Sequence, residues 1–409
     1  MMLPGVPDPP VPICFPLAGD IPVGGGHVSV SLLVQNLDRR RFRPIIALHG
    51  DGPVGRWLAG RGGGQEIEVL ASCVRDRHRV RIGDIAAICR RSWALARFLR
   101  ERNVAIVHVN DTIMLGTWAL AARLAGARLL WHKRGPWNGR WLHRFWFRAV
   151  DHVIAISAFA APPCPSSKCS TVYNPAGDDL ERLDRAECRR RLLEETGFSS
   201  SIRILGFFAD IDKERKRPQV FLETIASISA NAPQVQVAGL LFGHASSATE
   251  ARLRARAETL GIADRVHFMG FRYPPGPWLA ACDLLVAPSV DEGFGRTLIE
   301  AMLVGTIAVA ADSGGHREVI RNGETGFLVP PDDAQALAER VCRLLANPDE
   351  VAAFARRARK DALERFGTRR HVQAVVEVYE VLLSDGQPAS AGVLLAAGGA
   401  AALLVGADL

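Results

Sequence analysis

The stretch from Asp283 to Asp312 constrains the fold of this chain more than any other. The apolar run from Asp283 to Pro288 lacks the alternation of a half-exposed strand and stops at a Pro-Ser turn signal, so it predicts a buried parallel strand. After a glycine-containing loop, apolar residues take helical spacing from Arg296 until Gly305 ends it. A second buried strand is predicted for Ile307 to Ala311. This strand, loop, helix, strand order is the unit of a parallel α/β sheet.

The loop and the first helical turn of this unit are expected to bind a ligand, because the right-handed crossover places them at the carboxyl edge of the sheet. Gly293 and Gly295 let the backbone approach closely, and the N–H groups of the helix start offer a phosphate site. Glu292 in the loop and Glu300 in the helix would bind hydroxyl groups beside that phosphate. A nucleotide sugar has this arrangement, because its phosphates lie between the hydroxyl groups of a ribose and those of a hexose.

The residues of this region resemble those of a known family. The pattern P-S-x-x-E-G-F-G-x-x-x-x-E-A-M-x-x-G followed by S-G-G-x-x-E-V-I-x-x-G-x-x-G-F-L-V is similar to the retaining group 1 (family 4) glycosyltransferases. The family has the GT-B fold, an α/β architecture of two Rossmann-like doubly wound domains facing across a cleft. Two glutamates eight residues apart are weak evidence, but the whole string is specific. The competing interpretation, an ordinary βαβ unit with solvated glutamates, does not account for the extended match. The matching residues are Pro288, Ser289, Glu292, Gly293, Phe294, Gly295, Glu300, Ala301, Met302, Gly305, Ser313, Gly314, Gly315, Glu318, Val319, Ile320, Gly323, Gly326, Phe327, Leu328 and Val329.

The resemblance implies a donor site for a UDP- or GDP-linked sugar. It places Glu292 near the hexose, Glu300 near the ribose and Lys216 near the diphosphate, with Glu292 and Lys216 as the catalytic residues. The family's usual Gly-Arg pair is changed, since Phe207 follows Gly206, so Arg215 or Arg217 substitutes or the pocket has one cation fewer. The other implied donor-binding residues are Gly293, Phe294, Gly295, Arg296, Thr297, Phe271, Arg272, Arg215, Arg217 and Gly243.

The N-terminal half carries the expected acceptor-binding residues. A first strand at Val11–Leu17 leads into three glycines, but the spacing and the lack of a matching acidic residue argue against a dinucleotide fingerprint. A further strand, Ala105–Val109, ends near a position where the family often has a second histidine and this chain has asparagine. That difference weakens the argument that a histidine contacts the acceptor or the donor directly. The resemblance implies an acceptor cleft at Gly25, Gly26, His27, His108, Asn110 and Arg134.

Two basic segments suggest a surface for an anionic partner. The net charge is +7, and the segments are Arg75–Arg102, helical from Ile85, and Trp131–Arg148, which holds four of the eight tryptophans. An anionic membrane face or the acceptor cleft is favoured. Binding of nucleic acid is not expected, because no zinc, helix-turn-helix or RNA-binding signature accompanies the segments. For the first segment the alternative is a solvated face on a packed helix. For the second, the alternative is that Trp141, Phe145 and Phe147 belong to the core and the basic residues are solvated.

The chain is expected to divide into four parts. The acceptor domain spans 1–185, the donor domain 186–365, and a helix at 366–384 crosses back to the first domain. An apolar tail at 385–409 is too short for a spanning helix, since its uncharged run of 16 residues falls below the roughly 20 that are needed. Gly50–Gly64 is predicted to be a loop, and Glu364–Leu383 one long helix.

These observations predict a retaining, metal-independent hexosyltransferase of polysaccharide or glycoconjugate synthesis, acting on a glycan or lipid-linked acceptor. Neither a cofactor nor a metal is expected, because Asp210 and Asp212 lie in a basic, solvated loop. The N-terminus lacks a secretory signal, and the cysteines lack metal-site spacing, so the expected location is cytoplasmic, with peripheral binding at the inner membrane face. A non-catalytic nucleotide-sugar-binding scaffold and a nucleotide-sugar epimerase remain alternatives.

Overall fold

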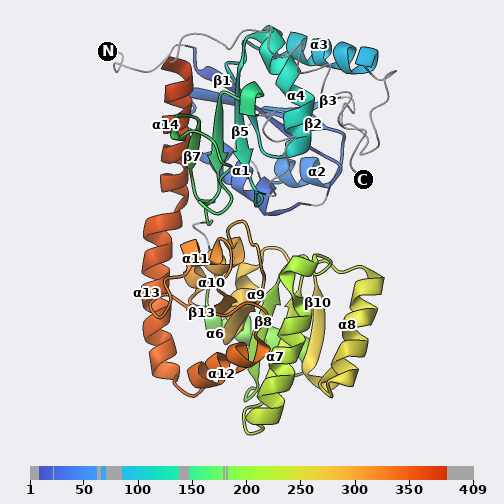
Figure 1. Cartoon of the computed structure of the whole chain (residues 1–409), viewed down its shortest axis with the longest axis vertical. Coiled ribbons are helices and arrows are strands. Elements are labelled where there is room, and N and C mark those ends of the chain that lie inside the picture. Colours follow the sequence, from blue (N-terminus) through green and yellow to red (C-terminus); the bar gives the residue numbers. More distant parts are fainter. Residues whose placement is uncertain are drawn as a thin grey trace. The chain divides into compact units, whose positions relative to one another are not determined.

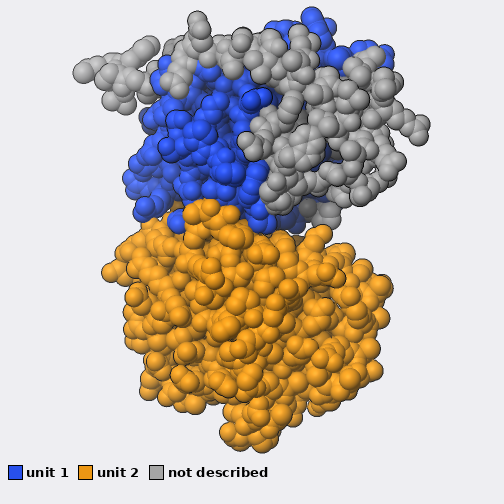
Figure 2. Space-filling view, viewed as in Figure 1, with its two compact units in different colours: residues 1–156, 160–173, 368–409 blue, residues 157–159, 174–367 orange. Residues whose placement is uncertain are grey.

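The chain forms two units in the computed structural model, which describes residues 9–21, 23–61, 66–70, 85–137, 147–177, 180 and 183–384, with the backbone alone for 85–88. Unit 1 comprises residues 1–156, 160–173 and 368–409, and unit 2 comprises 157–159 and 174–367 (Figure 2). The chain thus enters unit 2 after Tyr173 rather than at 185. The Ala176 N–H donates to the Phe366 carbonyl at 3.0 Å, which ties the segment after Tyr173 to the end of unit 2.

Unit 1 is built on a parallel sheet whose strand order is β3-β2-β1-β4-β5-β6-β7 (Figure 1). This is the doubly wound order, in which the direction of strand addition reverses between β1 and β4. Its strands are β1 (Val11–Ala18), β2 (Phe42–His49), β3 (Glu66–Leu70), β4 (Ile106–Val109), β5 (Arg128–Lys133), β6 (His152–Ala155) and β7 (Cys169–Thr171). Its helices are α1 (Gly25–Asn36), α2 (Pro53–Ala59), α3 (Ile85–Glu101), α4 (Thr112–Ala125) and α14 (Thr368–Ser384).

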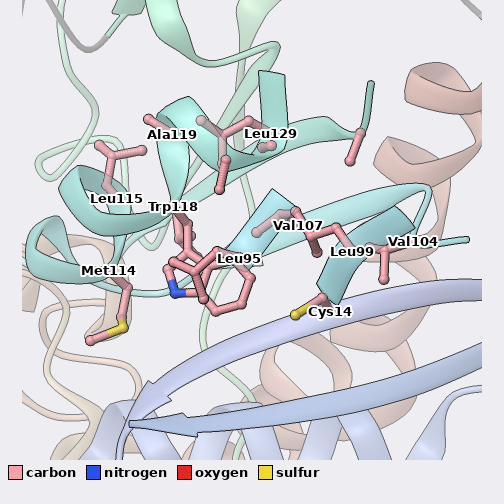
Figure 3. Close-up of a cluster of buried hydrophobic side chains, with 14 of the residues drawn as sticks. Cys14, Leu95, Leu99, Val104, Val107, Met114, Leu115, Trp118, Ala119 and Leu129 are labelled. Carbon is pink, nitrogen blue, oxygen red and sulfur yellow. The ribbon is translucent and has the colours of Figure 1, made fainter. Parts of the chain in front are cut away.

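Alternate side chains of the unit 1 strands face two apolar layers. Cys14 and Val107 point toward α3 and α4, where Trp118 is fully buried (Figure 3). Ile13 and Ile106 point to the opposite layer, formed with α1 and α14. Because strand side chains alternate with a period of two, His108 lies on the α14 side with Ile106. The sheet is therefore buried on both faces, as the apolar runs predict.

Unit 2 repeats the arrangement with strand order β10-β9-β8-β11-β12-β13, in which β10 and β13 are the edge strands. The reversal of strand order lies between β8 and β11. Its strands are β8 (Arg203–Phe208), β9 (Val237–Phe242), β10 (Val266–Gly270), β11 (Leu284–Ala287), β12 (Ile307–Ala311) and β13 (Phe327–Val329). Its helices are α6 (Arg185–Thr196), α7 (Pro218–Asn231), α8 (Ser247–Thr259), α9 (Gly276–Ala281), α10 (Arg296–Val304), α11 (His316–Val319), α12 (Ala334–Leu345) and α13 (Pro348–Phe366).

Two sequence predictions on secondary structure are wrong. The region 50–64 is not all loop, because Pro53 starts α2, which buries Val54 and Leu58 against the sheet. The expected single helix from Glu364 is two helices, since Gly367 has an extended conformation with φ −60° and ψ 146° between α13 and α14. The predicted tail and residues 75–84 and 138–146 of the basic segments lie outside the described residues. Among the described helices, none has the length and hydropathy needed to cross a bilayer.

Candidate functional site

The candidate site of unit 2 lies where its strand order reverses. The loop after β8 carries Arg215 and Lys216, and the loop after β11 carries Glu292. Because β8 and β11 are parallel neighbours, their carboxyl ends bring these two loops together. The Val290 N–H donates to the Arg215 carbonyl at 2.8 Å, which fixes one loop against the other. The expected ligand-binding edge therefore has the predicted residues on it.

Glu292 is the centre of a charged cluster in this site. Its carboxylate contacts the Lys216 ammonium, and Arg215 Nη1 lies 3.1 Å from the same oxygen. The side chains of Glu292 and Lys216 are each 16% exposed, whereas that of Arg215 is 39% exposed. Burial by itself would raise the pKa of Glu292, but the nearby Lys216 and Arg215 outweigh it, and the pKa is lowered. Two cations thus share one carboxylate, and the cluster carries a net positive charge.

The start of α10 borders this cluster. Gly295 adopts a left-handed conformation at φ +101°, and no side chain of the described residues caps the helix N-terminus with a hydrogen bond. One turn later, Glu300 is 7% exposed, and its Oε1 accepts from Arg296 Nε at 2.8 Å. The electropositive helix start and the adjacent cations Lys216 and Arg215 suit a phosphate or diphosphate.

A second loop supports the one that carries Glu292. The Gly315 N–H donates to the Glu292 carbonyl at 2.8 Å. A Cβ on Gly315 would lie 2.5 Å from the Phe294 Cα, and a Cβ on Gly314, where φ is +55°, would lie 2.5 Å from the Glu292 carbonyl oxygen. These contacts are with backbone atoms that have little room to move. The two glycines of the S-G-G string are therefore needed for the backbones to meet.

Other residues expected at the donor site have different surroundings. Phe294 is 2% exposed and packs edge-on against Phe366, so its side chain belongs to the core and only its backbone borders the loop. Arg217 pairs with Asp332 at 2.7 Å, which leaves Arg215 as the arginine beside Glu292.

The residues after β9 and β10 border the same sheet edge. Arg272 pairs with Glu195 and lies over the ring of Trp278, whereas Phe271 is 61% exposed. At Gly243 a Cβ would lie 1.6 Å from the Ala209 carbonyl oxygen, so the ends of β8 and β9 approach too closely for any other residue. Thr297 lies in the first turn of α10.

A small cluster of possible metal ligands lies at the ends of β8 and β9. Ligand atoms of Asp210, Asp212 and His244 are all within 4.8 Å of one another. Asp212, however, accepts hydrogen bonds from the N–H and hydroxyl of Ser246, the N-cap residue of α8. A hydrogen bond from the Thr249 side chain first, and then these two from Ser246, hold the pKa of Asp212 well below its usual range. Asp212 thus holds the N-cap residue of α8.

The expected acceptor residues of unit 1 also meet where the strand order reverses. Arg134 follows β5 and donates to Asn110 Oδ1 from Nε at 3.0 Å and from Nη2 at 2.8 Å. A Cβ on Gly26 would lie 3.2 Å from Arg134 Cδ, which places the glycine loop against this arginine. His27 Nδ1 accepts from the Gly24 N–H at 3.0 Å and caps α1, which begins at Gly25. Burial and then the charge of Arg134 lower the pKa of His27.

His108 lies beneath this cluster and not on its surface. It is 0% exposed, with Nδ1 2.7 Å from the Tyr379 hydroxyl and Nε2 3.2 Å from His132 Nδ1. Arg134 also donates to His132 Nδ1, at 3.3 Å. That nitrogen must therefore accept, so His108 carries its proton on Nε2 and accepts from Tyr379 at Nδ1. Burial first, and then Arg134, lower the pKa of His108 and His132 well below the ordinary value. The His108 side chain is therefore buried beneath the other residues expected at the acceptor cleft.

Sequence reasoning missed His132, Tyr379 and His371. His132 is a polar residue inside a buried strand, and this unusual pattern is the signal by which it could have been found. The other two come from α14, and His371 stacks on His132 with ring centroids 5.9 Å apart. Trp131, expected at an interface, is 1% exposed and belongs to the core.

Comparison with known proteins identifies two family domains. The model described as "Glycosyltransferase Family 4" matches residues 23–162, and that described as "Glycosyl transferases group 1" matches residues 202–347. The first match lies in the N-terminal half and the second in unit 2. Together they include both clusters described above.

Similar proteins of known name and structure agree with these matches. The chain is 28% identical over 248 residues (59% of the chain, 68% of the relative) to the lipopolysaccharide core biosynthesis mannosyltransferase LpsB of Rhizobium meliloti. It is 33% identical over 238 residues (55% and 52%) to a D-inositol 3-phosphate glycosyltransferase of Thermobispora bispora. The chain thus spans between half and about two thirds of the length of these relatives.

Solved structures share the fold over nearly the whole chain. Anabaena Alr3699/HepE in complex with UDP has a TM-score of 0.75 at 22% identity, covering 91% of this chain and 100% of that one. A glycosyltransferase from Rickettsia africae has a TM-score of 0.79 at 19% identity, covering 92% and 100%. The two parallel Rossmann-like sheets are therefore those of the GT-B fold, and the chain belongs to the group 1 (family 4) glycosyltransferases.

Proposed function

We propose that the chain transfers a hexose from a UDP- or GDP-sugar to a glycan or lipid-linked acceptor, with retention of configuration and without a metal ion. The observation that carries this proposal is the cluster of Glu292, Lys216 and Arg215 beside the start of α10. The complex of HepE with UDP and the mannosyltransferase LpsB support it, since they are proteins of similar fold and sequence. The proposed setting is synthesis of a surface polysaccharide or glycoconjugate.

In this proposal the cations of the cluster and the helix start bind the donor's diphosphate. Lys216 and Arg215 supply positive charge where negative charge grows as the sugar–phosphate bond breaks, and the N-terminus of α10 adds its partial positive charge. Such fixed charges can stabilise the departing diphosphate as a metal ion would. Glu300 binds the ribose hydroxyl groups, and Glu292 binds a hexose hydroxyl while it remains close to Lys216.

A covalent glycosyl-enzyme is not part of the proposed reaction. A double displacement needs a carboxylate directly behind the anomeric carbon, and in glycosidases its partner lies roughly 5 Å away. Glu292 is instead engaged by two cations at the diphosphate position, and Glu300 is engaged by Arg296. We therefore propose that the diphosphate accepts the acceptor's proton on the face from which it leaves.

The acceptor is proposed to bind unit 1 at the cluster of Arg134 and Asn110. Two hydrogen bonds to Asn110 hold the Arg134 guanidinium in one orientation next to Gly26. A positioned guanidinium suits an acceptor with a phosphate or carboxylate group, because it donates in a planar fork.

A peripheral membrane contact through α3 is proposed with this acceptor. Arg90, Arg91, Arg97 and Arg100 are exposed on one face of the helix, where Trp93 is 62% exposed, while Leu95 and Leu99 face the core. An exposed tryptophan among arginines suits the interface of an anionic bilayer. This places the proposed site of action at the inner face of the membrane.

Incubation of the pure protein with UDP- and GDP-sugars tests the function. Sugar transfer or slow donor hydrolysis is expected with one of them. Release of an epimerised nucleotide sugar would indicate an epimerase, and binding without turnover would indicate a scaffold. NMR of the first-formed linkage tests retention, and an inverted product would refute the mechanism. Loss of activity with EDTA and its recovery with Mn²⁺ would refute metal independence.

A further inference from the structure

A short segment of the chain, residues 157–159, is held against the loop that carries Glu292. Only Ile156 separates this segment from β6 of unit 1, yet its contacts assign it to unit 2. The hydroxyl of Ser157, which is 0% exposed, donates to the carbonyl of Gly293. The segment thus contacts the backbone at the residue directly after Glu292.

Glu318 of α11 holds the same segment from the other side. Its two carboxylate oxygens accept from successive backbone amides, with Oε2 2.8 Å from the Ala158 nitrogen and Oε1 2.9 Å from the Phe159 nitrogen. Ala158 and Phe159 are exposed residues, and the Glu318 carboxylate is the acceptor that their amides have. Charge-assisted hydrogen bonds of this bidentate kind are about twice as strong as neutral ones.

The backbone at Glu318 is itself held in place within unit 2. Arg365 of α13 donates to the backbone carbonyl of Glu318 and, at 3.2 Å, to that of Val319. On the other side, the ring of Phe159 lies beside Gly314, where an added Cβ would be 3.2 Å from Cε1. A continuous set of contacts therefore runs from α13 through Glu318 and the segment to the Gly293 carbonyl.

We infer that Glu318 and Ser157 are positioning residues for donor binding, acting through residues 157–159 on the backbone of the loop 291–295. This inference rests on the proposed function of that loop. Neither side chain needs to touch the donor. Their part is to hold the Gly293 carbonyl, and with it Glu292 and the start of α10, in the conformation that receives the diphosphate. Loosening the segment should weaken donor binding more than it weakens the fold.

Hydrogen–deuterium exchange tests the contacts of residues 157–159 without any need for activity. Glu318→Gln keeps the size of the side chain but replaces one accepting oxygen by a donor, so we expect faster exchange at Ala158 and Phe159 and in the loop 291–295. Ser157→Ala should speed exchange in the loop with less effect at the two amides. Glu324→Gln, a change at an exposed glutamate of the same unit, is the matched control. Unchanged exchange in both test variants would overturn the inference.

Donor kinetics then test the consequence. With the best donor, we expect each variant to raise KM by about tenfold with kcat changed far less, since the loss of a buried neutral hydrogen bond at Ser157 or of a charge-assisted one at Glu318 has effects of this order. The melting temperature should stay near that of Glu324→Gln. Ser157→Thr, which restores a hydroxyl, should recover part of the donor affinity. If the variants exchange faster but wild-type protein binds no nucleotide sugar, the structural role of Glu318 and Ser157 is confirmed and the proposed donor function fails. If wild-type protein is active and both variants keep its KM, the positioning role fails.

Discussion

The ammonium group of Lys216 contacts the carboxylate of Glu292 across 76 residues of sequence. Both side chains are mostly buried, and Arg215 adds a second cation to the same carboxylate oxygen. Removal of either cation would leave the mostly buried carboxylate of Glu292 with only one positively charged neighbour among these two. The pair is thus both a structural contact and the main electrostatic feature of the donor site.

We expect Lys216→Ala to lower kcat with the best donor by about 10²- to 10³-fold, with a smaller change in KM. The reason is that the charge met by Lys216 grows as the diphosphate leaves, so its contribution is larger in the transition state than in the ground state. Lys213→Ala is the control, because the Lys213 side chain is 60% exposed and lies in the same loop. Steady-state kinetics of the two variants measure the difference, and equal kcat values would contradict the assignment.

Glu300→Gln is expected to raise the donor KM by about tenfold while kcat changes less. The proposed ribose contact is made equally in the ground state and the transition state, and a loss of uniform binding appears in KM. The substitution also removes the charge that Arg296 meets at 2.8 Å. Titration with the free nucleoside diphosphate measures the same loss without turnover. Wild-type affinity for the nucleotide in this variant would exclude the ribose contact.

Gly315→Ala should weaken nucleotide binding and lower the melting temperature. Its Cβ would lie 2.5 Å from the Phe294 Cα, so the two loops must separate. We expect a loss of about 1–3 kcal/mol of stability, as for other overpacked sites. Gly177→Ala is the matched control, because a Cβ there meets nothing within 4 Å. Thermal unfolding with and without nucleotide compares them, and similar behaviour of the two variants would show that the loops have room to adjust.

Unit 1 should lose stability as the pH falls below about 6.5, the usual pKa of histidine. Burial lowers the pKa of His49 to about 4 and that of His371 to about 3. From 6.5 down to those values the unfolded state binds more protons than the folded state, so the free energy of unfolding decreases with falling pH, by up to about 1.4 kcal/mol per unit for each histidine.

Denaturant unfolding between pH 7.5 and 4.5 measures this slope. His371→Asn, whose amide can still donate to the Tyr173 carbonyl that His371 Nδ1 meets at 2.7 Å, should make the slope shallower. His244→Asn is the control, since the His244 side chain is 73% exposed. An unchanged slope in the His371 variant would show that this histidine is not a source of the acid sensitivity.

The α3 face should bind anionic vesicles at low salt and release them as salt increases. Arg91 and Arg100 lie on the exposed face with Trp93, and the attraction of such charges is screened over about 10 Å at 0.1 M salt. Co-sedimentation with vesicles that contain an anionic lipid measures binding. Arg91→Gln with Arg100→Gln should reduce it, whereas Arg252→Gln with Arg254→Gln in unit 2 should not. Failure of the wild-type protein to sediment at low salt would leave a soluble acceptor.

Local patterns in the sequence were enough to locate several elements of unit 2. Apolar runs bounded by turn residues located β11 and β12, and helical spacing ended by Gly305 located α10. The order of these elements also put Glu292 and Glu300 at the carboxyl edge of one sheet, and the family resemblance added Lys216. These predictions succeeded because side-chain periodicity and glycine conformation act within a few residues.

Contacts between residues that are distant in the sequence determine which side chains meet and which are buried. Ser157 bonds to Gly293 across 136 residues, and His108 meets Tyr379 across 271, so no local pattern reports either contact. The break at Gly367 was missed because the helical periodicity of the sequence continues through it, while the backbone there is extended. Packing of α14 against the sheet turned an expected acceptor-binding histidine into a buried one, since its strand face was covered by a helix that is remote in sequence.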